Sequence, residues 1–404
     1  MIGERPVPSV SFDHHSREFA DDPWSVCRDL RRQCPVAHSD AYGGFWVLSR
    51  YEDIKRVALD NETFSSAGSI VIPPKLNRQR SIPIELDPPL FQEYRRVMQR
   101  HFAPAAVQLL EPHIDRFANL CIDEFIERGA CDLVHDLADP VPAMTTLHLL
   151  GLPVDEWRSY SEPLHATVFL RQDNPGRVGA LEGLRRIRQT LITTIAQRRS
   201  RPGEDLISHL TQATIEDQPI SDDDVLEMAT LAIQGGFDTT GSLISNALVN
   251  LDLDRQARAR LIADPGLLAT AVEEFLRFEA PQFALARTVT RDVDIGGQTI
   301  RAGEKVLLVW ASGNRDEAVF PDAETLVLDR FPNRHMTFGL GAHRCLGSTL
   351  ARRMAHITLG AVLARLPDYS VDHARVVRAD TIGVVYGKFS VPATFGPGPR
   401  RMEA

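Results

Sequence analysis

One cysteine lies in a glycine-rich segment, FGLGAHRCLG at 338–347, directly before a run that predicts a helix over Gly347–Leu366. Glycines let a backbone turn tightly and let a flat ligand approach closely. A helix N-terminus stabilises a thiolate through its dipole and its free N–H groups. Cys345 is therefore a candidate thiolate ligand for iron, with a buried structural cysteine as the alternative. A phosphate loop is excluded, because Arg344 stands where the third glycine of Gly-x-Gly-x-x-Gly belongs.

A second segment, GGFDTT at 235–240, lies midway along a predicted apolar helix. Glycine in a helix interior costs about 0.5–1 kcal/mol relative to alanine. A threonine hydroxyl can also bond the carbonyl four residues back and bend the helix. Two glycines followed by an acid and two hydroxyls therefore need a compensating role. The candidates are a packing notch for a crossing helix and a polar reaction site.

Charged residues at helical spacing form the other candidate features. Glu274 and Arg277 are three residues apart, so they share one helix face and can pair. Taken alone, such a pair is most often a surface interaction worth about 0.2–0.5 kcal/mol. A further predicted helix begins after Asp87, with prolines in its first turn, and carries several arginines including Arg95.

Together these segments resemble the cytochrome P450 family. The sequence FGLGAHRCLG matches the family's haem-binding loop, Phe-x-x-Gly-x-x-x-Cys-x-Gly, and the other segments follow in family order over about 46–391. The chain looks closest to soluble bacterial members, including the camphor-hydroxylating type. The resemblance implies a mainly α (α+β) fold: a single helix-rich domain over residues 1–404, with small β-sheets and a long central helix across the haem.

The resemblance also implies haem b as cofactor, held through Cys345 as the proximal ligand. An anionic thiolate there pushes electron density onto the iron and favours O–O cleavage. The family's usual histidine four residues before Arg95 is Phe91 here, so one haem propionate contact is absent or replaced. The residues implied to contact the haem are Arg95, Arg287, Phe338, His343, Cys345 and Gly347.

Two more family motifs match. Glu274 and Arg277 resemble the ExxR pair, which joins an arginine before the haem loop, here Arg330, in a structural role. Asp238 and Thr239 match the acid–alcohol pair of the oxygen-activation groove. There Thr239 holds dioxygen or a water, and Asp238 relays protons in a general acid role. The presence of both residues favours monooxygenation.

Helical periodicity dominates the rest of the chain. The clearest helix begins at Ser221, a plausible N-cap followed by three aspartates, and extends to about Asp254, which is roughly 45 Å at 1.5 Å per residue. Short strands are predicted around Val293–Ile295 and over Lys305–Trp310. Further helices are predicted over Leu109–Arg128, Val154–Leu170, Gly179–Arg199, Gln256–Ala263 and Leu267–Phe278.

Composition narrows the class of protein. The 404 residues carry a net charge of −9, which argues against a general nucleic-acid binder. The N-terminus shows no signal-peptide pattern, and no run is long and apolar enough to span a membrane. Five cysteines without a CxxC pair argue against a disulfide scaffold and a structural zinc site. We therefore expect a cytoplasmic protein with no nucleic-acid or membrane partner.

Electrons must come from separate proteins, since no flavin or iron–sulfur domain is recognisable in the chain. Arg96 and Arg100 on the first arginine helix, with Arg352 and Arg353 after Cys345, border the proximal haem face in the family's fold. A local basic face on an acidic chain attracts an acidic donor. We expect a ferredoxin with its ferredoxin reductase, the alternative for each arginine being ordinary surface charge.

The resemblance outlines a mostly apolar distal pocket, which fits a hydrophobic substrate oriented by few polar groups. Gln234 is the polar exception, and it bonds either a substrate oxygen or nitrogen or a neighbouring backbone group. Ordinary core packing would give the same apolar residues. The candidate pocket residues are Leu231, Gln234, Gly235, Phe283, Leu285, Val384 and Val385.

The expected function is monooxygenation with O2 of a hydrophobic small molecule, such as a terpenoid, an aromatic or a natural-product intermediate. One alternative is the same oxidant used for desaturation, ring closure or coupling. A different class is a haem-thiolate sensor without turnover, against which the pair of Asp238 and Thr239 argues.

Overall fold

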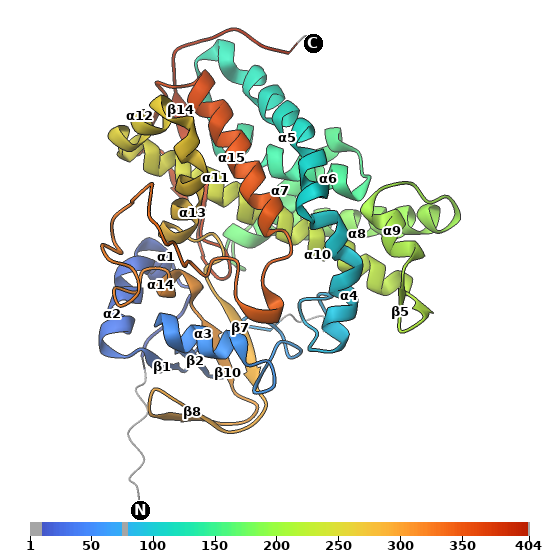
Figure 1. Cartoon of the computed structure of the whole chain (residues 1–404), viewed down its shortest axis with the longest axis vertical. Coiled ribbons are helices and arrows are strands. Elements are labelled where there is room, and N and C mark those ends of the chain that lie inside the picture. The colour runs from blue at the N-terminus through green and yellow to red at the C-terminus, as the bar shows by residue number, and fades with distance from the viewer. Residues whose placement is uncertain (1–9, 75–79, 403–404) are drawn as a thin grey trace, which may run out of the picture.

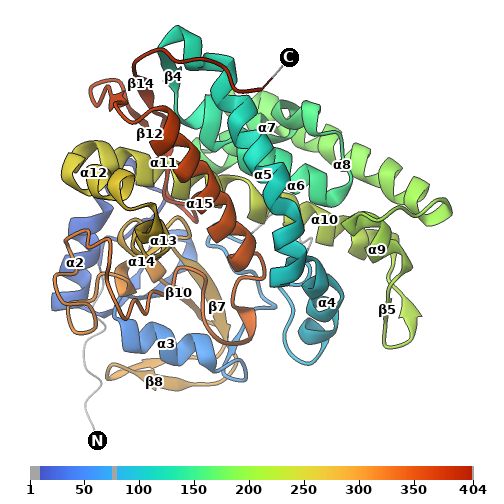
Figure 2. The ribbon, with the colours of Figure 1, turned by 45° about the horizontal axis from the view of Figure 1, so that its top comes forward.

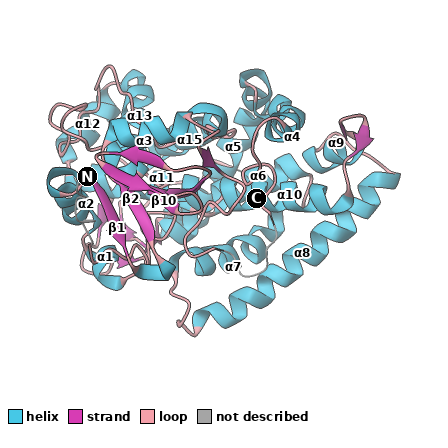
Figure 3. Ribbon diagram, turned by 90° about the horizontal axis from the view of Figure 1, so that it is seen from below, coloured by secondary structure: helices cyan, strands magenta, loops and turns pink. Residues whose placement is uncertain are grey.

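The structure is a computed structural model that describes residues 10–74 and 80–402. Helices make up most of it, and the largest sheet lies at one side of them (Figures 1 and 3). The predicted mainly α fold with small sheets is therefore confirmed. Among the described residues, no helix combines the length and apolarity that crossing a membrane requires.

Fifteen α-helices lie in the described residues, joined by 3₁₀ turns such as η2 (Arg100–Phe102) and one π-helical segment, η4 (Val134–Ala138). The α-helices are α1 (Arg17–Asp21), α2 (Pro23–Gln33), α3 (Tyr51–Leu59), α4 (Leu90–Gln99), α5 (Pro104–Phe125), α6 (Pro140–Leu150), α7 (Trp157–Phe169), α8 (Gly176–Ser200), α9 (Leu206–Gln212), α10 (Asp222–Gly236), α11 (Asp238–Leu253), α12 (Arg255–Ala263), α13 (Leu268–Phe278), α14 (Trp310–Gly313) and α15 (Ser348–Arg365).

The main sheet has the order β1-β2-β10-β7-β3 and is antiparallel except where β10 pairs parallel with β2. A three-stranded sheet has the order β11-β14-β4, and three two-stranded pairs complete the set. The strands are β1 (Val36–Ser39), β2 (Phe45–Leu48), β3 (Phe64–Ser65), β4 (Ala130–Asp132), β5 (Thr214–Ile215), β6 (Gln218–Pro219), β7 (Leu285–Val289), β8 (Val293–Ile295), β9 (Gln298–Ile300), β10 (Lys305–Leu308), β11 (Ser370–Val371), β12 (Val377–Arg378), β13 (Lys388–Ser390) and β14 (Pro392–Thr394).

The central helix is interrupted, which corrects the prediction of one continuous helix over 221–254. Its start is as expected, because the Ser221 side chain accepts the N–H of Asp224. At Phe237 the backbone leaves helical geometry (φ −86°, ψ −84°), and this break separates α10 from α11. The Thr239 hydroxyl donates to the Gly235 carbonyl at 2.9 Å across the break, which is the local bond that bends helices.

The helices around the break pack closely. Helix α15 lies alongside α5 in both views, and it also contacts α11 (Figures 1 and 2). Most of the buried apolar side chains of these helices belong to one continuous core. The predicted strand over Lys305–Trp310 is shorter than expected, since β10 ends at Leu308 and Trp310 begins α14.

Candidate functional site

A cavity lies between the break in the central helix and the loop before α15. Its walls are mostly apolar, with the thiol of one cysteine and the hydroxyls of four threonines among them. The sequence-predicted residues Leu231, Gly235, Thr239, Leu285, Phe338, Cys345 and Gly347 all line it, as do Arg95, Arg287 and His343. Side chains that the sequence did not single out also line it, including Phe102, Ala232, Thr240, Leu243 and Leu350.

The loop that carries Cys345 is held by its own backbone. The Cys345 N–H donates to the Phe338 carbonyl at 2.7 Å. Gly341 has φ +69°, and a Cβ there would lie 2.8 Å from the Ala58 carbonyl oxygen, so this position requires glycine. Gly347 is the N-cap residue of α15. The predicted placement of Cys345 before a helix N-terminus is therefore observed.

The thiol opens to the cavity. The protein around it displaces water and raises the pKa of Cys345, whereas the backbone N–H of Gly347 and the charge of Arg95 act to lower it. Phe338 packs beneath the Arg352 guanidinium, whose Cζ lies 4.4 Å from the ring centroid. Arg352 is fixed in turn by Glu273, 2.6 Å from its Nε.

Two polar groups at the cavity lack the partners that buried groups normally have. Arg287 is 4% exposed, and within the described residues its guanidinium donates one hydrogen bond, to the Ala286 carbonyl at 2.8 Å. Burial lowers its pKa to about 10. Both ring nitrogens of His343 are buried without a hydrogen-bond partner. Burial, followed by the charge of Arg287, lowers the pKa of His343 to about 3, so its imidazole is neutral.

These unpartnered groups fit the haem that the family resemblance implies. A guanidinium and a neutral imidazole N–H are donors that suit a propionate carboxylate. The apolar walls suit a macrocycle, and Cys345 supplies a soft ligand for its iron. Arg95 also lies at this rim, although one of its nitrogens already bonds the Arg344 carbonyl at 2.6 Å.

Phe91 does not supply the missing polar contact. Its ring packs on His343, with 4.0 Å between the ring centroids, and the Arg95 guanidinium lies 5.7 Å from its centroid. It therefore supports two neighbouring polar residues through packing. A histidine at this position would add a donor, whereas Phe91 fixes the orientation of the donors already present.

The two glycines of the break have different surroundings. A Cβ on Gly236 would lie 2.5 Å from the Thr146 hydroxyl of α6, so this position is a packing notch. A Cβ on Gly235 would meet nothing within 4 Å, and Gly235 lines the cavity. The segment therefore forms a packing notch at Gly236, and both of its glycines line the cavity. Its role as a reaction site stays a prediction.

Asp238 and Thr239 point in different directions. Thr239 lines the cavity, while within the described residues Asp238 does not belong to the cavity lining. The Asp238 carboxylate is 4% exposed and bonds His165 Nδ1 at 3.0 Å. Sequence reasoning missed His165, because a lone histidine in a predicted apolar helix carries no spacing signal.

Glu274, Arg277 and Arg330 form a buried network, not the surface pair that spacing alone suggested. The side chains of Glu274 and Arg277 are 0% exposed and make two bonds, of 2.7 and 2.8 Å. Arg330 Nε lies 3.1 Å from both Glu274 oxygens. The carboxylate also accepts from Asn333 Nδ2 and from the Val327 N–H. The three predicted residues are therefore brought together.

Four of the predicted pocket residues lie elsewhere. Gln234 is exposed and lines an adjacent cavity, which shares Leu231 with the first. Phe283 is 0% exposed and packs edge-on against Phe19, so it is a core residue. Val384 and Val385 pack in a small cluster with Phe169. Family position alone could not separate these core side chains from cavity walls.

We expect Glu274→Gln to lower the free energy of unfolding by about 3–5 kcal/mol, because two buried guanidiniums would lose their counter-charge. The measurement is the shift of the denaturation midpoint in urea, followed by tryptophan fluorescence.

Arg260→Ala is the matched control. Arg260 pairs with Asp329 at 3.0 Å, but the side chains are 55% and 57% exposed, so the loss should stay within about 1 kcal/mol. Equal midpoints for the two variants would contradict the buried-network interpretation.

Comparisons with known proteins agree with this site. The family model described as Cytochrome P450 matches residues 168–372. Cytochrome P450 130 of Mycobacterium tuberculosis is 33% identical, covering 92% of this chain and 95% of its own. The steroid C26-monooxygenase of Mycolicibacterium smegmatis is 32% identical, covering 88% of each. The structure of Mycobacterium marinum cytochrome P450 CYP268A2 in complex with pseudoionone has a TM-score of 0.89 at 31% identity, covering 96% of this chain and 99% of that one.

The match extends over nearly the whole chain in both sequence and fold, and the cavity presents the thiol, the donors and the apolar walls that the family's cofactor needs. The chain therefore belongs to the cytochrome P450 family, as a bacterial-type monooxygenase whose cofactor is haem b.

Proposed function

We propose that this enzyme inserts one oxygen atom from O2 into a hydrophobic small molecule, such as a terpenoid, an aromatic or a natural-product intermediate. One observation carries the proposal: the Cys345 thiol and the Thr239 hydroxyl line the same apolar cavity from two different elements. The relatives named for a steroid and solved with pseudoionone support this range of substrates.

In the proposed site, haem b supplies the redox chemistry through an iron held by the Cys345 thiolate. Arg287, His343 and Arg95 hold the propionates. Thr239 donates its hydroxyl hydrogen to the Gly235 carbonyl at 2.9 Å, so its oxygen presents lone pairs to the cavity. It can therefore accept a hydrogen bond from a water molecule in the cavity.

Asp238 has the complementary role of bringing protons to this side of the cavity. It directly precedes Thr239 at the start of α11. Burial raises the pKa of Asp238, against the lowering effect of its bond to His165. A carboxyl with a raised pKa exchanges protons more readily near neutral pH.

We also propose that the whole chain, residues 1–404, forms one domain and that the enzyme works in the cytoplasm. The continuous core across the helices supports a single domain. All five cysteines are free thiols, which supports a reducing compartment.

We expect Cys345→Ser to abolish the shifted Soret band that thiolate ligation gives in the carbon monoxide difference spectrum of the reduced protein. A serine hydroxyl is not a comparable anionic ligand. Cys34→Ser is the control, because Cys34 is half-buried and does not line the cavity, so the band should stay intact. A normal band in Cys345→Ser would refute the assignment.

Gln234 is proposed as a polar contact for substrate on its way between the two cavities. Its side chain is exposed and lines a cavity with apolar residues of α7, α8 and α10 and with the charged residues Arg185, Arg188 and Glu227. Leu231 borders both cavities, so a ligand passing it also passes Gln234.

We expect Gln234→Leu to weaken binding of substrates that carry an oxygen or nitrogen, by about tenfold for one lost hydrogen bond. Binding is measured by the substrate-induced spin shift. Gln197→Leu, at an exposed position of α8, should change nothing. Unchanged affinity and regioselectivity in Gln234→Leu would exclude the contact.

A separate ferredoxin, reduced by its reductase, is the proposed electron donor. The four arginines expected at its docking face are not equivalent. Three of them are paired with a glutamate and so largely neutralised: Arg353 with Glu111 at 2.8 Å, Arg352 with Glu273 at 2.6 Å and Arg96 with Glu93 at 2.8 Å. Arg100 is exposed and lies two residues from Phe102, which lines the cavity beside Cys345.

We expect Arg100→Glu to raise the KM for ferredoxin several-fold and to weaken its salt dependence, since a favourable long-range attraction becomes repulsion. The carbon monoxide spectrum should not change. Arg128→Glu, beyond the other end of α5 and about 30 Å away at 1.5 Å per residue, is the control. Equal KM values for the two variants would remove this face from consideration.

A further inference from the structure

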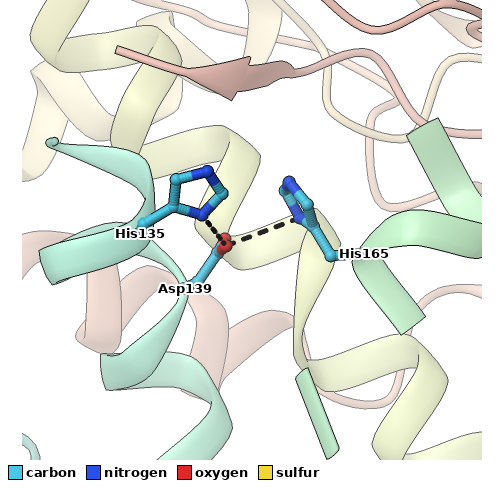
Figure 4. Close-up of side chains that lie close together, drawn as sticks. All are labelled: His135, Asp139 and His165. Carbon is cyan, nitrogen blue, oxygen red and sulfur yellow. Dashed lines mark ion pairs between the residues drawn. The ribbon is translucent and has the colours of Figure 1, made fainter. Parts of the chain in front are cut away.

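Four ionisable side chains meet on a side of α11 that does not line the cavity. His165 Nδ1 lies 3.0 Å from Asp238 Oδ1 and 3.5 Å from Asp139 Oδ2. His135 Nδ1 lies 3.7 Å from the same Asp139 oxygen. Figure 4 shows the two imidazole rings converging on Asp139 from different segments. We call His135, Asp139, His165 and Asp238 the histidine–aspartate chain.

The histidine–aspartate chain runs from the surface to the interior. The His135 side chain is 41% exposed, whereas those of Asp139, His165 and Asp238 are 8%, 6% and 4% exposed. Each member is within 3.7 Å of the next, which is within reach of a hydrogen bond after small side-chain motion. The buried carboxylate of Asp238 is therefore connected to solvent by groups that can all hold a proton.

The backbone brings these groups together at specific places. His135 lies in η4, a π-helical segment, and such segments are frequent at functional sites. Asp139 follows η4 directly. A Cβ on Gly241 of α11 would lie 2.9 Å from the Ala138 carbonyl and 3.2 Å from Asp139 Oδ1. Only a residue without a side chain lets η4 and Asp139 approach α11 this closely.

The charges favour a proton on His165. Burial lowers the pKa of His165, but the carboxylates of Asp139 and Asp238 outweigh it and raise the pKa to about 9, helped by the Phe389 carbonyl. The pKa of His135 is raised as well, mainly by Asp139 and against burial, with Asp132 beyond it. His165 therefore carries a proton at neutral pH, and loses it as the pH rises through about 9.

We propose that His135, Asp139 and His165 form a proton-entry path that supplies Asp238 from solvent. In one cycle His165 Nδ1 gives its proton to the Asp238 carboxylate, which carries it toward Thr239. His135 Nδ1 protonates Asp139, and Asp139 passes that proton to the vacated His165 Nδ1. His135 then takes a proton from water, so one proton enters for each one delivered.

This inference rests on the proposed role of Asp238 and adds three positioning residues to it. A single nitrogen of His165 faces both carboxylates, so the transfer needs no ring flip. An ordinary ion-pair cluster would hold Asp238 equally well with a donor that does not titrate. A donor at position 165 that cannot titrate should therefore impair proton delivery if the path exists, and should change nothing if the cluster is an ordinary ion-pair cluster.

The test variant is His165→Asn, whose amide nitrogen stands near the position of Nδ1 and can bond Asp238 without exchanging its proton. In the holoenzyme with ferredoxin and its reductase, we expect several-fold less product per NADPH and a larger solvent isotope effect. The fall in turnover as pH rises through about 9 should disappear. Substrate affinity from the spin shift should stay unchanged.

His135→Asn should give a smaller change of the same kind, and His148→Asn, on α6, should give none.

A second readout does not depend on turnover. Histidine carbon NMR of the reduced carbon monoxide complex, with His165 assigned from its missing signal in His165→Asn, should show a protonated ring at pH 7. A neutral ring there would overturn the proposal. So would one zinc per chain in the purified holoenzyme that is lost in His165→Asn, because the cluster would then be a metal site.

The variant Asp238→Asn distinguishes failure of the proton-entry path from failure of the proposed role of Asp238. If it uncouples turnover while His165→Asn behaves like the unmodified enzyme, the entry path is wrong and the role of Asp238 stands. If neither variant changes coupling or the isotope effect, both proposals fail.

Discussion

The buried carboxylate of Glu274 is the constraint on which the rest of the site depends. It is the counter-charge of two arginines, Arg277 and Arg330, in a place with almost no access to water. Arg277 in turn donates to the carbonyls of Asn314, Ala323 and Thr325. The network therefore ties α13 to the irregular chain that leads into the Cys345 loop, where no regular helix or strand could hold it.

The sequence predicted the site best where short spacing and chemistry coincide. Glu274 and Arg277 share a helix face, and Cys345 precedes a helix, so local geometry alone placed them correctly. How deeply the ion pair is buried depends on residues 37 to 59 positions further along the chain, which no local pattern encodes. The same holds for Phe283, which is apolar in either a cavity wall or a core and is found in the core.

The sequence did not predict that the helix breaks at Phe237, although it showed the glycines and hydroxyls that weaken the helix there. Glycines and hydroxyls within a helix predict that the helix is weakened, but they do not predict the residue at which it breaks. The position follows from tertiary contacts: Gly236 must admit Thr146 of α6, and Gly241 must admit the Ala138 carbonyl. Gly236 and Gly241 are thus fixed by packing, and Gly236 borders the cavity as well.

The two sides of the central helix have different surroundings at the start of α11. Thr239 faces the cavity, while Asp238, the residue before it, is turned toward His165 and the surface beyond. Helix α11 also packs against α15, whose N-terminal loop carries Cys345. The thiol is thereby held in a fixed relation to the Asp238–Thr239 pair. On the two proposals made above, electrons arrive at the face that carries Arg100 and protons arrive through the histidine–aspartate chain. The two then reach the cavity from different elements, and neither requires the cavity to open to bulk water.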